Sequence, residues 1–238
     1  MSTAVVSAKG GVGKSSFCVF AGRTLSQHGR ETLLIDMDVG VRSLDLLLGV
    51  AEKTMYNWGD VLSGNCDVKK AVINVAPHLY LLAAPLSYHE NCTKEDFKSL
   101  VLSLEKDFEF ILLDSPAGIE RGFTFSAFSC ESCIVVSTQD PISIRAAGNA
   151  AALVRTFGIK NIRLVLNRFD KKSKTGICID DLVDEVGARL LGVVPEDRNI
   201  RAASFGKELP YDSKASLAFV RIAGRMCGEN IPFRIKNL

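Results

Sequence analysis

Two lysines, three glycines and two serines stand together near the start of the chain, in the segment K-G-G-V-G-K-S-S at positions 9–16. An apolar run precedes this segment and a helical pattern beginning F-C-V-F-A follows it, which is the order of a phosphate-binding loop. Glycines let backbone N–H groups converge on phosphate oxygens, and the N-terminus of the helix adds the positive end of its dipole. Lys14 is placed to reach the β- and γ-phosphates of a nucleotide, and the Ser15 hydroxyl to complete the coordination of Mg²⁺. The residues expected to bind ATP in this loop are Lys9, Gly10, Gly11, Val12, Gly13, Lys14, Ser15 and Ser16.

The loop departs from the strict pattern G-x-x-x-x-G-K-[ST], because Ala8 occupies the first position. It matches K-G-G-x-G-K-[ST] in full, with the additional lysine at Lys9. A glycine-rich turn with incidental lysines is the structural alternative. The segment therefore predicts a Mg-ATP site with one lysine more than an ordinary phosphate loop.

Short apolar runs alternate with helical patterns along the chain, and they predict the framework that holds this loop. Continuous apolar runs are typical of strands buried on both faces, and therefore of a mainly parallel sheet. The predicted strands are Thr3–Ser7, Glu31–Asp36, Leu79–Ala84, Phe108–Asp114, Cys133–Thr138, Ile162–Asn167 and Leu190–Val194. Helices are predicted from a capping box at Thr93, from Pro141 to Phe157, and over about 216–227.

This alternation predicts an α/β fold, a doubly wound and mainly parallel sheet with helices on both faces. Ligands of such folds bind at the carboxyl ends of the strands, where the polar motifs of this chain fall. No linker divides the sequence, so we expect one P-loop ATPase domain over 1–238, ending in a short tail over 228–238.

Further motifs give the chain a resemblance to a known family. They are D-M-D-V-G-V-R-S-L-D (36–45), D-S-P-A-G-I-E (114–120), Q-D-P-I-S-I-R (139–145), L-N-R (166–168), V-V-P-E-D (193–197) and G-E-N-I-P-F (228–233). Together with the phosphate loop they resemble the MinD/ParA family of deviant Walker A ATPases over nearly the whole chain. The G-x-R-x-L-D, D-S-P-A-G-I-E and P-E-D stretches favour the MinD branch over ParA. Flagellar-number ATPases of the FlhG type share several of these motifs and remain the close alternative.

The resemblance implies roles for Lys9 and three carboxylates. Lys9 would be the signature lysine that crosses a dimer interface to the partner's phosphates, where a second ammonium offsets charge in the transition state. Asp38 would orient the attacking water, so the expected catalytic residues are Lys9, Lys14 and Asp38. Asp36 and Asp114 would lie in the outer shell of the Mg²⁺ that Ser15 binds directly. The structural alternative for both carboxylates is a capping role at a strand end.

The resemblance also implies an adenine-binding region formed by two segments. These segments contribute Asn167, Arg168, Pro195, Glu196 and Asp197. An amide at Asn167 can pair with the N6 and N7 edge of adenine, which would disfavour guanine. Alternatively, Asn167 caps a turn and Pro195 ends a strand.

Composition excludes several broad classes of protein. The 238 residues are 47% hydrophobic, with 29 basic and 27 acidic side chains and a net charge of +2, so no general attraction to nucleic acid is expected. We find no apolar run of membrane-spanning length and no pattern of a signal peptide. Seven scattered cysteines are typical of small buried residues in a reducing compartment. A cytoplasmic protein is expected, with peripheral association at the inner membrane left open.

Some weaker signals define alternatives. Cys130 and Cys133 form C-E-S-C, which would allow an iron–sulfur carrier only if a second subunit completed the ligand set. A DNA-partition protein would need a basic face built from Arg198, Arg201, Arg221 and Arg225. The histidines at 28, 78 and 89 have no metal-ligand spacing, and the lysines at 171, 172 and 174 are expected in a solvated loop.

The tail bears on attachment to membranes. MinD relatives usually end in an amphipathic helix that binds membrane when the dimer forms. Here only P-F-R-I-K-N-L follows at 232–238, with Phe233 and Ile235 as its apolar residues, which is too short for a stable interfacial helix. The expected function is an Mg-ATP-dependent dimerising ATPase switch that regulates the division site. Hydrolysis would be slow and stimulated by partners of the MinC and MinE type.

Overall fold

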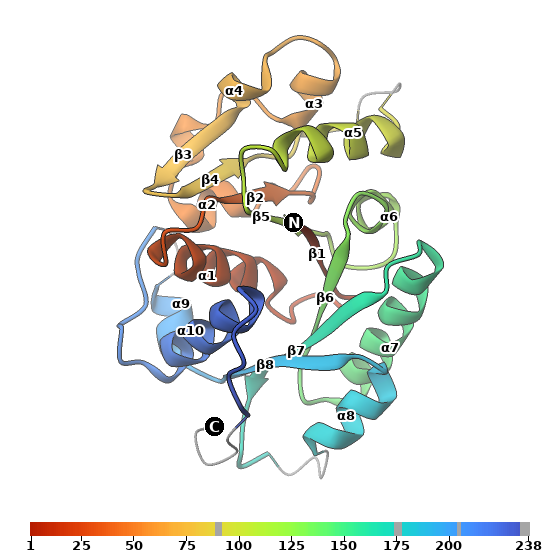
Figure 1. Ribbon diagram of the computed structural model, residues 1–238, viewed down its shortest axis with the longest axis vertical. Helices are drawn as coiled ribbons and strands as arrows, with labels where there is room; N and C mark the ends of the chain where they lie inside the picture. The colour runs from red at the N-terminus through yellow and green to blue at the C-terminus, as the bar shows by residue number, and fades with distance from the viewer. Residues whose placement is uncertain (89–91, 174–177, 204–205, 234–238) are drawn as a thin grey trace.

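The computed structural model describes residues 1–88, 92–173, 178–203 and 206–233. His89, Lys174, Ile235 and the end of the predicted tail lie outside the described residues. Within these ranges one eight-stranded sheet runs through the molecule in the order β3-β4-β2-β5-β1-β6-β7-β8 (Figure 1). The strands are β1 (Ser2–Val6), β2 (Thr32–Asp36), β3 (Val72–Ala76), β4 (Leu79–Leu82), β5 (Phe110–Asp114), β6 (Ser132–Ser137), β7 (Asn161–Phe169) and β8 (Arg189–Pro195).

Neighbouring strands of the sheet are parallel, except that β3 pairs with β4 in the antiparallel sense. The predicted mainly parallel sheet is therefore confirmed, and each predicted strand is present with ends shifted by no more than a few residues. The prediction missed β3. This edge strand is only half buried, so its sequence V-I-N-V-A lacks the continuous apolar run that marks the central strands.

Helices cover both faces of the sheet (Figure 1). They are α1 (Lys14–Gln27), α2 (Leu44–Leu48), α3 (Trp58–Leu62), α4 (Val68–Ala71), α5 (Lys94–Leu104), α6 (Arg121–Phe128), α7 (Pro141–Thr156), α8 (Ile179–Val186), α9 (Arg198–Ala202) and α10 (Lys214–Met226), with a 3₁₀ turn at Ala51–Lys53. One apolar cluster joins α1, α2 and α10 to one face of the sheet. Two further clusters cover the other face, one with α6, α7 and α8 and one with α3, α5 and α6. The doubly wound α/β class is thus confirmed.

The ends of the helices follow from local capping. The capping box predicted at Thr93 is present, because the Asp96 N–H donates to Thr93 Oγ1 at 3.1 Å. The last helix begins at Lys214, two residues earlier than expected, because Ser213 is its N-cap and accepts from the Ser216 N–H at 3.1 Å. No helix among the described residues has the length and apolar character needed to cross a membrane.

Strand order decides what lies around the phosphate loop. The first strand, β1, lies between β5 and β6, and the loop that leaves it leads into α1. The chain reverses its direction of winding here, and this switch point is where α/β sheets leave a crevice for a ligand. Side chains at the carboxyl ends of β2, β5, β6, β7 and β8 can therefore converge on one loop.

Candidate nucleotide-binding site

Two glycines give the loop between β1 and α1 its shape. Gly11 has a φ of 76° and Gly13 a φ of 93°, a left-handed conformation that residues with a Cβ rarely adopt. A Cβ on Gly13 would also lie 2.3 Å from Asn167 Nδ2, so no other residue fits there. Backbone conformation therefore explains both glycines, and close packing against Asn167 adds to the requirement at Gly13.

Lys14 opens α1 and turns its ammonium group inward. Its Nζ donates to Ser7 Oγ at 3.0 Å, and Ser7 Oγ in turn donates to the Lys9 carbonyl at 2.7 Å. Burial lowers the pKa of Lys14, while the nearby charges of Asp114 and Asp38 raise it. A buried cation that is held by a hydroxyl rather than by an ion pair is available to an anionic ligand.

Asp36 and Asp114 end the two neighbouring strands β2 and β5 and are direct partners in the sheet register. Both side chains are almost fully buried. Burial raises the pKa of Asp36 to about 6, although backbone N–H groups of Leu44 and Asp38 donate to it. Burial and the charge of Asp36 raise the pKa of Asp114 to about 7, against opposing effects of Ser15 and Lys14. Two carboxyl groups are thus kept close together where water cannot screen their charges.

This arrangement fits a magnesium ion, because a bound cation would relieve the repulsion between the buried carboxyl groups. Ser15 lies near Asp114, because it acts to lower the pKa of that carboxyl group, and its hydroxyl could coordinate the ion directly. Asp36 and Asp114 could then accept hydrogen bonds from its water ligands. No group of three or more His, Cys, Asp or Glu residues in the described ranges could hold a metal. The donor set fits an ion that is held largely by phosphate and water.

Asp38 lies two residues beyond the end of β2, and its backbone N–H donates to Asp36 Oδ1 at 2.9 Å. Burial raises the pKa of its carboxyl group, and the charge of Lys14 partly offsets this. Its partly exposed carboxylate therefore lies within electrostatic range of the lysine at the phosphate loop. A carboxylate in this place could orient a water molecule near a bound triphosphate.

Lys9 does not share the inward environment of Lys14. Its Nζ lies 2.8 Å from Asp140 Oδ1, and the side chains of the pair are 38% and 37% exposed. Burial raises the pKa of Asp140, but hydrogen bonds from Lys9, Thr138 and the Ser143 N–H outweigh it and hold the pKa at about 2. Sequence reasoning missed Asp140 as a site residue. The signal present was the D-P pair of a helix N-cap directly after β6.

The two predicted adenine segments meet beside the phosphate loop, at a small pocket of about 120 Å³. It is lined by Gly13, Ser16, Asn167, Arg168, Glu196, Asp197, Ile200 and Arg201. Pro195 ends β8 and is not among these residues. Ile200 and Arg201 were not anticipated, because they lie on the short helix α9, which no periodic pattern announced.

Hydrogen bonds distinguish the two polar residues of this pocket. Asn167 is buried, and its Nδ2 donates to the Val12 carbonyl at 2.8 Å. A carbonyl only accepts, so this contact fixes the orientation of the amide and leaves Oδ1 as its free acceptor. Asp197 accepts from the N–H groups of Asn199 at 2.9 Å and Ala215 at 3.1 Å. Its carboxylate thus connects α9 to the start of α10.

The alternative sites do not assemble in the same way. Cys133 is fully buried in β6 and Cys130 partly so, and a thiol within the core cannot reach a cluster shared with a second subunit. Arg225 is committed to the carbonyls of Ile231 and Leu191, each at 2.9 Å, whereas Arg198 and Arg201 are exposed. His28, His78, Lys171 and Lys172 lie exposed, as expected.

Comparison with known proteins gives the same assignment as this geometry. The nucleotide-binding domain family CobQ/CobB/MinD/ParA matches residues 3–210. A putative septum site-determining protein MinD from Emiliania huxleyi is 38% identical over 96% of this chain and 88% of that protein. The septum site-determining protein MinD of Bacillus subtilis is 32% identical over 97% of this chain and 90% of that protein.

Solved structures agree with the relatives in sequence. The MinD cell division protein of Aquifex aeolicus superposes with a TM-score of 0.88 at 30% identity, covering 98% of this chain and 99% of that one. The MinD of Pyrococcus horikoshii complexed with Mg-ADP gives a TM-score of 0.84 at 25% identity, covering 94% and 95%. Similarity therefore extends over nearly the whole length of the chain. The chain belongs to the MinD/ParA family of nucleotide-binding ATPases, as a MinD-type member.

Proposed function

We propose that this MinD-type protein, whose role is the spatial regulation of the cell-division site, works as an Mg-ATP-dependent dimerising switch. In this proposal residues 1–238 act as a single ATPase domain. Two copies enclose two ATP molecules between their phosphate loops, and slow hydrolysis separates them. The cytoplasm is the expected compartment, and peripheral association at the membrane is not required.

The observation that carries the proposal is the position of Lys9. Its ammonium group is paired with Asp140 at the surface of the molecule, at 2.8 Å, and not with the hydroxyl that holds Lys14. A lysine needed only by its own loop would gain most from pointing inward. An exposed ammonium at the mouth of the site is suited to a phosphate on a facing copy, once that phosphate replaces Asp140 as its partner.

Within each copy, the proposal gives each site residue a role. Lys14 exchanges the Ser7 hydroxyl for phosphate oxygens, and the N–H groups of residues 10–16 bind the remaining oxygens. Ser15 would hold magnesium directly, with Asp36 and Asp114 in its outer shell, and the ion would supply positive charge beside the β- and γ-phosphates. Asp38 orients the water that attacks the γ-phosphate. Asn167, Arg168, Pro195, Glu196 and Asp197 flank the adenine, with Asn167 Oδ1 accepting from its N6 amino group.

Protein partners are part of the proposal. A solved MinC:MinD cell division complex from Aquifex aeolicus matches this chain with a TM-score of 0.89 at 29% identity, covering 98% of each chain. We therefore expect a MinC-type partner for the ATP-bound dimer. A second partner, of the MinE type, would stimulate hydrolysis.

The proposal is tested by measuring the mass of the protein in solution with ATP and Mg²⁺. The measurement uses an Asp38→Ala variant, so that ATP hydrolysis does not dissociate the dimer. We expect the mass to double with ATP and to stay that of one chain with ADP. Lys14→Ala is the matched control. Its free energy of ATP binding should be weaker by several kcal/mol, because the buried contact between Lys14 and phosphate is lost, and the variant should remain a monomer. A monomer at high concentration of Asp38→Ala with saturating ATP would reject the dimeric switch.

A further inference from the structure

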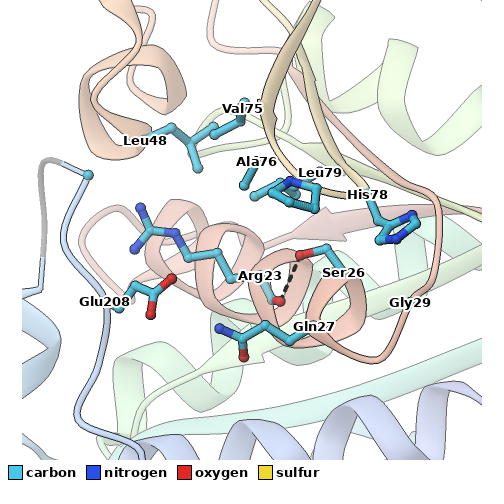
Figure 2. A pocket seen from close by; sticks show the side chains of 12 residues that line it. Arg23, Ser26, Gln27, Gly29, Leu48, Val75, Ala76, His78, Leu79 and Glu208 are labelled. Carbon is cyan, nitrogen blue, oxygen red and sulfur yellow. Dashed lines mark hydrogen bonds between the residues drawn. The ribbon is translucent and has the colours of Figure 1, made fainter.

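A second cavity, of about 410 Å³, lies along the C-terminal half of α1, whereas the phosphate loop precedes the N-terminus of this helix. Figure 2 shows the residues that line the cavity. Its residues come from four separate parts of the chain, which form three sides. The C-terminal half of α1 and Gly29 form one wall, Leu48 and the β3–β4 turn form another, and Gly206 and Glu208 close a third side. None of its residues lines the adenine pocket, so the two cavities are distinct.

Arg23 supplies the charge of this cavity, and Figure 2 shows its guanidinium group between Leu48 and Glu208. Burial lowers the pKa of Arg23, which means that the fold keeps a cation partly removed from water. Its Nη1 donates to the carbonyl of Lys207. Among the described residues no carboxylate lies within ion-pair distance of Arg23. The charge of Glu208 acts on Arg23 and partly offsets the effect of burial on its pKa, but Glu208 does not form a direct ion pair with the guanidinium group.

The opposite wall is apolar and is formed by Leu48, Val75, Ala76, Pro77 and Leu79. His78 stands at the far end, and its Nδ1 lies 2.6 Å from Glu31 Oε1. Ser26 is likewise committed, because its Oγ donates to the Arg23 carbonyl at 2.8 Å (Figure 2). The cavity thus combines one available cation with an apolar surface, at a volume typical of small-molecule sites.

We infer that this cavity binds a small organic monocarboxylate, with its carboxylate on Arg23 and its apolar body against the β3–β4 turn. A guanidinium group matches a carboxylate with two parallel hydrogen bonds. Glu208 decides between a carboxylate and a phosphate monoester. It lies close enough to influence Arg23, so it repels a dianion more strongly than a monoanion. This site goes beyond the proposed ATPase switch and does not depend on it.

The test uses 3-phenylpropionate as the ligand and its uncharged amide and phenyl phosphate as comparisons. Binding is measured by calorimetry and ligand-observed NMR on the full chain with saturating Mg-ADP, so that the phosphate loop cannot take up the acid. We expect 3-phenylpropionate to bind and both comparison compounds to bind more weakly.

Three variants locate the binding. Arg23→Gln should weaken it by about tenfold or more, because a charge-assisted contact is lost. Ala76→Phe fills the apolar side of the cavity and leaves the guanidinium group in place. This variant should abolish binding. Arg30→Gln is the matched control and should bind like the wild type, because Arg30 is an exposed arginine paired with Glu109 at 3.4 Å. Thermal unfolding of each variant establishes that it is folded.

Several results would overturn the inference. Absence of binding to the wild-type protein at millimolar concentration is one, and unchanged binding in both Arg23→Gln and Ala76→Phe is another. Equal affinity for the amide would mean that the guanidinium group plays no part. Tighter binding of phenyl phosphate would mean that the site prefers a different class of ligand.

Discussion

At the scale of single residues, the carboxyl groups of Asp36 and Asp114 set how the nucleotide-free protein should respond to pH. Their pKa values in the fold, about 6 and about 7, lie above the value of about 4 expected in the unfolded chain. Between these limits the folded state binds more protons than the unfolded state. The free energy of unfolding contributed by these groups therefore falls as the pH rises from about 4 to about 7, since ionisation is costlier in the fold.

Asp114→Asn should flatten this dependence, because it removes one of the two titrations and the repulsion with Asp36. At neutral pH the nucleotide-free variant should be more stable than the wild type by on the order of 2 kcal/mol. Urea unfolding in EDTA at several pH values between 4 and 7 measures it. Equal slopes for the two proteins would show that Asp114 is ionised throughout this range.

Asn167 is the residue on which base preference should depend. Its Nδ2 donates to the Val12 carbonyl at 2.8 Å, which orients Oδ1 as an acceptor. Oδ1 can accept from the amino group of adenine, but it cannot form a hydrogen bond with the carbonyl of guanine, which is itself an acceptor. Asn167→Ala should lower the preference for ATP over GTP by roughly five- to tenfold. Competition against a fluorescent nucleotide measures the ratio. Asn161→Ala, at the exposed start of the same strand, should leave it unchanged, and an unaltered ratio in Asn167→Ala would exclude this role.

At the scale of elements, a glycine allows β8 and α10 to pack closely against each other. A Cβ on Gly192 would lie 2.2 Å from Ile222 Cγ1 and 2.6 Å from its Cδ1, and Ile222 is fully buried. The strand that leads to Pro195 can therefore approach α10, whose Ala215 N–H donates to Asp197, only because residue 192 has no side chain. This contact fixes the adenine side of the site from behind.

Gly192→Ala should destabilise the protein by about 1–3 kcal/mol through overpacking. Ile222→Ala alone should cost about 2–5 kcal/mol because it opens a cavity. In the double variant the new methyl group occupies part of that cavity, so the cost should be clearly less than the sum. Urea denaturation of the four proteins gives the coupling free energy. Additive costs would mean that the two residues do not touch in solution.

At the scale of the whole molecule, apolar side chains surround the mouth of the nucleotide site. Val41, Leu86, Ile119 and Ile142 are exposed by 66%, 71%, 56% and 72%, and each follows the carboxyl end of a different strand. The loops carrying Val41 and Leu86 are joined by the Gly40 N–H, which donates to the Pro85 carbonyl at 3.1 Å. Apolar residues gathered on the face that also presents Lys9 are suited to contact with a second copy.

Ile142→Glu should therefore prevent ATP-dependent dimers while leaving ATP binding by the single chain intact. The residue lies in the first turn of α7, whose N-cap Asp140 holds Lys9. A buried carboxylate at this interface would cost several kcal/mol, enough to weaken dimers more than a hundredfold. Leu102→Glu, on the outer face of α5, is the control and should dimerise normally. If Ile142→Glu formed dimers at the same protein concentration as the wild type, the interface would have to lie on another face of the molecule. Analytical ultracentrifugation with ATP and Mg²⁺ distinguishes these cases.

What the amino-acid sequence determined by itself is local. The phosphate loop, the buried runs and the capping box at Thr93 are each encoded within a few consecutive residues, so pattern and chemistry were enough to predict them. Asp36 and Asp114 could be predicted at strand ends for the same reason. The short helices and β3 could not, because they are held by packing and not by their own periodicity.

Only the tertiary structure decided which of these residues meet. The pairing of Asp36 with Asp114, of Lys9 with Asp140 and of Asn167 with Val12 depends on the order β2-β5-β1-β6-β7, which crossover connections set and no local pattern contains. Burial is decided in the same way, and with it the pKa values of the carboxyl groups and of Arg23. Solvation depends on everything that surrounds a group in space, whereas a sequence motif specifies only what precedes and follows it along the chain.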